Sequence, residues 1–341
     1  MDPREQLERL LKVKAAFPTA DAMPVVDDLL RRLPFSPHEH DRAERGLTTE
    51  SRFADVFSAL PWTRLIHGLD QRQLPSESKT TLQVPDFLAI VQPADIHNES
   101  AVLLDTKLAS GQKETLELQL SQMDCLQRYA GVLALPLLLA VFWERLHMWT
   151  VHTPDQFRTA ERHARLSLSH ALRNDLAVIF SDSVIPITTT WRRRTTYDPN
   201  AEGFHLRHPD RGWIIEDHLA TDGKTFVKLS EVESGVLTRL APFKTLETTI
   251  DGPRRTILSE NGTERATKLS SVVHLLLEDF DGFGDDTQPD IAFNTFVKFK
   301  VDANVATFPG LPEKPTPQVT TLFEHVFGFT WNDESTAGAS G

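Results

Sequence analysis

The chain has 341 residues, of which 40% are hydrophobic and 25% are charged, and its formal net charge is −12. This length exceeds what one hydrophobic core usually organises, and the acidic balance excludes indiscriminate coating of nucleic acid. No apolar run reaches the roughly 18 residues that a membrane span needs. Cys125 is the only cysteine, which excludes an intrachain disulfide and a cysteine zinc cluster. We therefore expect no membrane contact and a reducing, cytoplasmic setting.

Helical and extended patterns alternate along the first half of the chain. Residues 4–33 predict a helical lead-in broken by prolines, followed by a polar connector. Apolar residues at helical spacing predict a helix over 48–60, capped by Thr48 or Thr49. The segments after it predict a short strand, two acid-bearing strands (84–91 and 101–107), a helix over 113–131 ending at Gly131, and two further strands up to 151. This order predicts a mixed α/β unit with a central sheet.

Both acid-bearing strands carry a carboxylate where a buried strand normally avoids charge. Asp105 and Lys107 are two positions apart, so their side chains leave the strand on the same face. Asp86 lies on the preceding strand, which can pair with theirs through the connector 93–100. Two carboxylates and an ammonium can therefore converge. The alternative is that all three are solvated at an exposed strand end.

Such a convergence suits one kind of chemistry. Carboxylate oxygens, together with a substrate phosphate and water, are the ligands of a magnesium site. A metal there polarises a phosphodiester and generates hydroxide near neutral pH, and a lysine beside it orients or deprotonates the water or neutralises developing charge. The spacing therefore favours phosphodiester hydrolysis.

The segment Pro85-Asp86, followed 19 positions after Asp86 by Asp105-Thr106-Lys107, resembles the PD-(D/E)XK signature of restriction endonucleases, Holliday-junction resolvases and related repair and defence nucleases. The resemblance covers residues 45–151. It implies that Asp86, Asp105 and the main-chain carbonyl of Thr106 bind Mg²⁺, with Mn²⁺ as a substitute. It also implies that Lys107 is the catalytic lysine and that hydrolysis leaves a 5′-phosphate.

Three further residues follow from the same resemblance. Glu50 holds the place in chain order of a glutamate that many members carry on the helix before the sheet, and it would join the catalytic and metal-binding groups. Gln127 and Tyr129 would support the active site from the following helix. Their spacing departs from that of the RecB-like subgroup, in which glutamine would replace Cys125, so no subgroup is assigned.

A basic stretch follows the α/β unit. From residue 158 to 194 there are seven arginines and three acids. We expect a helix over 155–173 and phosphate contacts from the arginines at the two ends of this stretch: Arg158, Arg162, Arg165, Arg192, Arg193 and Arg194. An ordinary solvated helix is the alternative. From residue 275 to the end, eleven acids face three bases, which suggests a protein contact or autoinhibition.

We therefore expect a helical region over 1–44, a restriction-endonuclease-like domain over 45–180 with a mixed central sheet flanked by helices, an α+β domain over 181–330 and a disordered tail over 331–341. The function expected from the resemblance is a Mg²⁺-dependent DNA nuclease of the repair, restriction or phage-defence type. The alternatives are an inactive nuclease-like module that binds nucleic acid or protein, and an RNA- or structure-specific nuclease. A homodimer and a protein partner of the acidic C-terminal region are further expectations.

Overall fold

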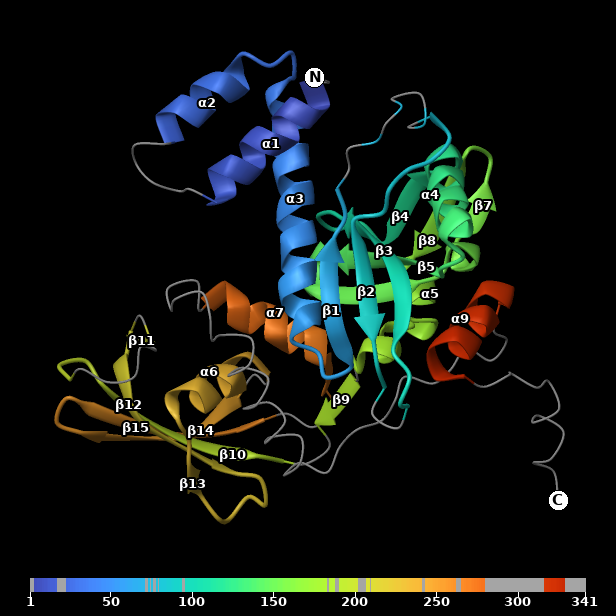
Figure 1. The fold of residues 1–341 in the computed structure, drawn as a ribbon. Helices are drawn as coiled ribbons and strands as arrows, with labels where there is room; N and C mark the ends of the chain where they lie inside the picture. Colours follow the sequence, from blue (N-terminus) through green and yellow to red (C-terminus); the bar gives the residue numbers. More distant parts are fainter. Residues whose placement is uncertain are drawn as a thin grey trace, which may run out of the picture.

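The structure, a computed structural model, describes residues 3–16, 23–70, 73, 75, 78, 80–93, 96–182, 184–187, 190–201, 207–208, 210–240, 243–261, 265–279 and 316–328. The expected tail over 331–341 and most of the acidic C-terminal region lie outside these residues. Two large sheets organise the described residues, and the second lies to one side of the first (Figure 1).

Within the described residues, five strands form the first sheet in the order β1-β2-β3-β5-β6. These strands are β1 (Thr63–Gly68), β2 (Phe87–Val91), β3 (Ser100–Ala109), β5 (Leu137–Trp143) and β6 (Met148–His152). Neighbours are antiparallel except β3 and β5. A parallel pair needs a long crossover, which β4 (Thr115–Gln119) and α4 (Leu120–Leu133) supply. The mixed sheet with its helices confirms the predicted α/β class and the pairing of the two acid-bearing strands.

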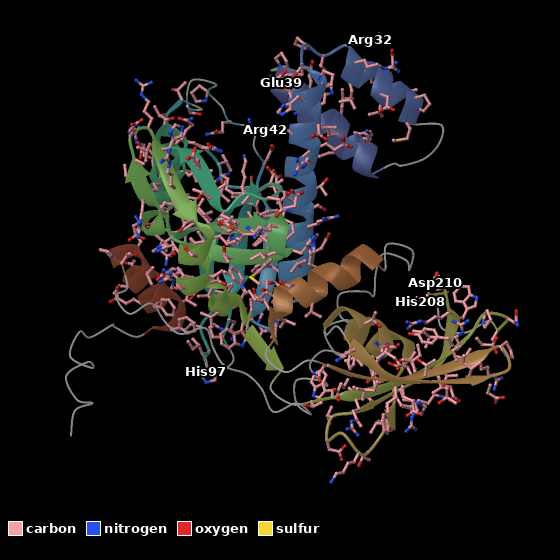
Figure 2. All side chains as sticks on the ribbon, turned by 180° about the vertical axis from the view of Figure 1, so that it is seen from behind. Arg32, Glu39, Arg42, His97, His208 and Asp210 are labelled. Atoms are coloured by element: carbon pink, nitrogen blue, oxygen red, sulfur yellow. The ribbon has the colours of Figure 1, made fainter. Side chains whose placement is uncertain are left out.

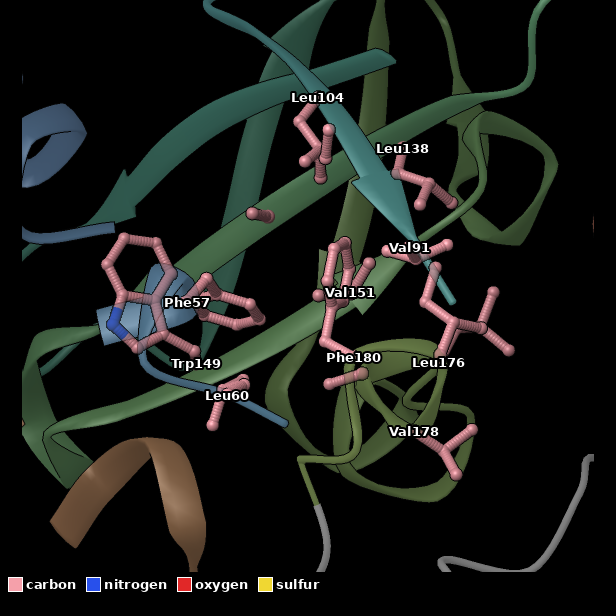
Figure 3. Close-up of a cluster of buried hydrophobic side chains, with 14 of the residues drawn as sticks. Phe57, Leu60, Val91, Leu104, Leu138, Trp149, Val151, Leu176, Val178 and Phe180 are labelled. Carbon is pink, nitrogen blue, oxygen red and sulfur yellow. The ribbon is translucent and has the colours of Figure 1, made fainter. Parts of the chain in front are cut away.

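Apolar side chains form a core on each face of this sheet. In β3, Val102 and Leu104 pack into one core and Leu103 into the other, as strand alternation requires. The first core holds α3 (Pro37–Ser58) against the sheet, with the rings of Phe57 and Trp149 centred 6.0 Å apart (Figure 3). The second core lies under α4 and a small sheet of β4, β8 (His163–Ser167) and β7 (Arg158–Ala160).

The second sheet has its own small core beneath α6 (Glu231–Leu240), made of Trp191, Leu219, Leu229 and Leu237. The strand order is β11-β12-β10-β15-β14, with β13 paired to β12. Its strands are β10 (Arg192–Asp198), β11 (Arg207–His208), β12 (Gly212–Ala220), β13 (Val227–Lys228), β14 (Phe243–Asp251) and β15 (Arg254–Asn261). Figure 2 shows this sheet from behind, with His208 and Asp210 labelled on it.

The chain enters and leaves the second sheet through a two-stranded ladder of β9 (Val184–Ile187) and β16 (Arg265–Lys268). Lys268, at the end of the ladder, is buried, and its Nζ lies 2.6 Å from both Asp175 Oδ2 and Asp182 Oδ2. Asp182 also accepts hydrogen bonds from the backbone and hydroxyl of Ser270, in the first turn of the next helix. The buried ion pairs of Lys268 and the hydrogen bonds from Ser270 to Asp182 thus fix the point where the chain leaves the second sheet.

After this return, α7 (Leu269–Asp279) and α9 (Pro317–Phe327) pack on the first sheet. The first core includes Leu269, Val272 and Val273 of α7 and Val319, Leu322, Phe323 and Val326 of α9. We predicted from the sequence that both segments belong to a domain over 181–330. The structure instead packs their apolar residues with those of 45–180, because both helices present apolar faces that the first sheet covers.

Several predicted elements differ from the structure. Residues 155–173 are not one helix: β7 and β8 form a hairpin, and only α5 (Leu168–Arg173) is α-helical. The helix expected over 113–131 begins as β4, and α4 ends at Leu133, with Ala134 as its left-handed C-cap, instead of at Gly131. The polar connector before 48 belongs to α3, because Ser36 and Glu39 form a capping box at its first turn. No helix in the described ranges is long and apolar enough to cross a bilayer.

Burial of His152 predicts a pH dependence of stability. Burial lowers the pKa of this imidazole to about 4. Between pH 6.5, the usual pKa of histidine, and about pH 4, the unfolded chain takes up a proton at this residue and the folded protein does not. Acid therefore lowers the free energy of unfolding over this range. We expect His152→Gln to reduce this loss by about 2 kcal/mol between about pH 7 and about pH 4.5, measured by urea denaturation. The exposed His67, changed to Gln, is the control. Equal pH slopes for both variants would contradict the prediction.

Candidate active site

The two acid-bearing strands meet as an antiparallel pair whose register sets their polar residues side by side. Phe87 pairs with Leu104, and continuing this antiparallel register places Asp86 opposite Asp105. The Oδ2 atom of Asp86 accepts two hydrogen bonds from Thr106, one from its backbone N–H and one from its hydroxyl, each 2.7 Å long. Asp86 is therefore held against β3 beside Asp105.

Asp105 and Lys107, both on β3, form an ion pair. Asp105 is only 1% exposed and its Oδ2 contacts the ammonium of Lys107, whose side chain is 16% exposed. The same ammonium donates a hydrogen bond of 3.2 Å to the main-chain oxygen of Thr106. Asp105 and Lys107 leave β3 on one face, as predicted, whereas Thr106 leaves on the other.

Burial and neighbouring charges shift the protonation of this pair. Burial raises the pKa of Asp105 to about 7; Lys107 opposes the shift and Asp86 adds to it. For Lys107, burial disfavours the charged form, but the attraction of Asp105, Asp86 and Glu50 outweighs burial and raises its pKa. A carboxylate with so strongly shifted a pKa is typical of functional sites, although structural ion pairs produce the same shift.

Glu50 reaches this site from α3. It contributes to the potential at Lys107, and it lines a groove of about 990 Å³ together with Asp86. Asp70 lines the same groove and was not predicted from the sequence. Its position follows from pairing: the residue before it, Leu69, donates its N–H to the main-chain oxygen of Asp86 at 2.8 Å. An acid directly after a short strand, WTRLIHGLD, was the signal for this residue.

The donor set fits a hard divalent cation. Asp86, Asp105 and the carbonyl of Thr106 offer oxygen ligands within two adjoining strand ends. Within the described residues, no three His, Cys, Asp or Glu side chains form a ready metal cluster. Mg²⁺ needs no such cluster, because it commonly binds one or two carboxylates and completes its shell with water and substrate phosphate.

The residues expected to support the site from α4 lie elsewhere. Gln127 lines a different cavity, of about 290 Å³, together with Pro136, Thr153 and His325. Tyr129 packs against the second core. The structure therefore gives neither side chain a contact with Asp86, Asp105 or Lys107.

The arginines expected to contact phosphate are not on one helix. Arg158 lies in β7 and Arg165 in β8, where the two residues face each other across the hairpin; Arg162 lies in the turn between them, and all three are exposed. Arg165 pairs with Glu117 at 2.8 Å. The helix expected for these residues was wrong, because arginines at this spacing also fit a β-hairpin.

The remaining three arginines lie on β10. Arg192 and Arg194 are exposed, and the Arg194 guanidinium lies 4.1 Å from the ring centre of Phe226. Arg193 points to the other face, where it is buried and bonded to Asp217 and Ser234. Its expected contact with nucleic acid is wrong, because the two-residue alternation of the strand turns it into the small core.

Comparisons with known proteins add little to this geometry. No protein-family model matches the chain, and no curated protein matches it. Among solved structures, the chain is similar to Hjc, a Holliday junction resolvase from Archaeoglobus fulgidus, with 14% sequence identity and a TM-score of 0.30. The match covers 40% of this chain and 96% of the resolvase. A likeness at this level carries no argument about activity.

The buried pair generates a prediction about stability. In Lys107→Met the carboxylate of Asp105 loses its partner, and we expect the free energy of unfolding to fall by about 3 kcal/mol near neutral pH. The double variant with Asp105→Asn should recover most of this loss, since no buried charge is then left alone. Denaturant titration of the four proteins in the cycle measures the coupling. Exposed Lys113, changed to Met, is the matched control. Additive effects of the two substitutions would contradict the predicted coupling.

Proposed function

We propose that this chain is a Mg²⁺-dependent nuclease that hydrolyses DNA phosphodiester bonds, with Asp86, Asp105, Lys107 and Glu50 in its active site. The observation that carries the proposal is the meeting of Asp86 with the Asp105-Thr106-Lys107 segment at the adjoining ends of β2 and β3. The Asp105 carboxylate is almost fully buried beside Lys107, which costs free energy that an apolar side chain at this position would avoid.

Each residue has a distinct part in this proposal. Asp86, Asp105 and the Thr106 carbonyl would hold the metal ion, with Glu50 beside them; Mn²⁺ is a chemically similar substitute. When bound, such an ion polarises the phosphodiester and makes water a stronger nucleophile. Lys107 presents a positive charge and mobile N–H donors beside Asp105, so it can donate to a phosphate oxygen as negative charge develops there.

The exposed arginines supply contacts of a different kind. Arg158, Arg162, Arg165, Arg192 and Arg194 would bind phosphate groups and position the strand without reading its sequence. Arg193 has no part, because Asp217 already compensates its charge. This part of the proposal is independent of the chemistry at Asp105.

Cleavage assays test the chemistry directly. Supercoiled, linear and single-stranded DNA and RNA are incubated with the protein and Mg²⁺, Mn²⁺ or EDTA. We expect metal-dependent cleavage of DNA, and at least about a hundredfold slower cleavage by Asp86→Asn and by Asp105→Asn, because each removes a carboxylate ligand of the metal ion. Asp124→Asn, an exposed carboxylate on α4, is the matched control and should retain the wild-type rate.

Two outcomes would contradict the proposal. If both site variants cleave as fast as the wild type, the activity belongs to another site or to a contaminant. If the wild type leaves all four substrates intact but binds one of them, the fold serves as a binding module. Preferential cleavage of RNA would keep the chemistry and change the substrate.

A further inference from the structure

The N-terminal helices lie over the same end of the sheet as the candidate active site. α3 has 22 residues, which is about 33 Å of helix. Its last two turns bury Phe53, Val56 and Phe57 in the first core, and its N-terminal half extends beyond the sheet (Figure 1). There it carries α1 (Pro3–Ala16) and α2 (Met23–Arg31). His97, in the β2–β3 connector, lies at the end of the first sheet opposite to these helices (Figure 2).

This helical hairpin is fixed in place by its own core and by an ion pair. Leu7, Leu11, Val26 and Leu30 form a buried cluster against α3. Farther along α3, Arg45 Nη2 lies 2.9 and 3.1 Å from the carboxylate oxygens of Glu144, which follows β5. α1 therefore stands at a defined position relative to the ends of β2 and β3.

The groove beside Asp86 has walls of opposite charge. One wall is the end of the sheet and α3, with the carboxylates of Glu44, Glu50, Asp70 and Asp86 and the guanidinium of Arg52. The other wall is α1, with Lys12 and Lys14. A strand that reaches Asp86 through this groove passes α1 on the way.

The two lysines of α1 differ in their surroundings. Lys14 lies 3.3 Å from Glu44 and 3.7 Å from Asp27, so its charge is already compensated. Lys12 is exposed, and no ion pair joins it to any side chain that the structure describes. Lys12 thus offers the less compensated of the two charges to a ligand in the groove.

We propose that Lys12 is a positioning residue that binds a backbone phosphate of the nucleic acid next to the cleaved bond. This inference rests on the proposed nuclease function and adds the N-terminal hairpin to the substrate site. A wall with four carboxylates and one guanidinium repels phosphate on balance, so a cation on the facing wall helps to hold a strand in register. The need is greater in a chain whose formal net charge is −12.

The test compares Lys12→Ala with the wild type in binding and in cleavage. Affinity for a short labelled DNA duplex and for its single strand is measured by fluorescence anisotropy over a range of salt concentrations, with Ca²⁺ in place of Mg²⁺. We expect Lys12→Ala to weaken binding several-fold at low salt and to reduce the slope of log affinity against log salt by about one. In cleavage assays with Mg²⁺, KM should rise and kcat should change little, because Lys12 does not touch the reacting atoms.

Two further variants make the result specific. Lys12→Arg keeps the charge and should restore both affinity and salt slope. Lys228→Ala removes an exposed lysine from β13 of the second sheet and should leave both unchanged. If Lys12→Ala and Lys228→Ala both bind like the wild type, or if Lys12→Arg fails to restore affinity, the inference is wrong while the nuclease function stands. Weaker binding by Lys12→Ala in a protein that cleaves no substrate would contradict the nuclease function and keep the groove as a binding site.

Discussion

The almost complete burial of the Asp105 carboxylate is the constraint on which this end of the molecule depends. A buried carboxylate is tolerated only with a partner, and strand alternation supplies Lys107 two residues later on the same face. The partner does not remove the cost, since burial still raises the pKa of Asp105 to about 7. A core strand made of Leu103, Leu104 and a paired charge is less stable than a wholly apolar one, and both functional sites and structural ion pairs contain such charges.

The other elements of the site follow from holding that strand rigidly. β3 lies at the centre of the sheet, between β2 and β5, so its position is fixed on both edges. Thr106 uses its backbone and hydroxyl to hold Asp86, which turns a neighbouring strand end into a second oxygen ligand. α3 then has two tasks, because one half packs against the sheet and the other half supports the N-terminal hairpin. Stability of the core and shape of the groove are therefore coupled through a single helix.

The sequence predicted what is local and periodic. Apolar runs bounded by polar turns correctly predicted β2, β3, β5 and β6. The two-residue spacing of Asp105 and Lys107 correctly predicted that their side chains share one face of β3. Long-range packing was not predictable in this way: nothing local shows that α7 and α9 return to the first core. Arginine spacing in 158–173 failed because charge spacing, unlike apolar spacing, does not report which face is buried. Arg193 was misplaced because three consecutive arginines hide the alternation of a strand, and Asp70 was missed because only the β1–β2 pairing brings it to the groove.

An acidic chain that binds a polyanion must concentrate its positive charge where the ligand lies. Several basic side chains are unavailable because buried acids already compensate them: Lys268 by Asp175 and Asp182, Arg193 by Asp217. Arg193 belongs to the basic stretch found in the sequence, so that stretch is partly structural. The exposed cations that we propose as phosphate contacts lie apart from one another, on the β7–β8 hairpin, on β10 and on α1. A ligand that meets only some of them is held weakly unless a divalent ion also neutralises the carboxylates of the groove, so binding and metal occupancy should be mutually dependent.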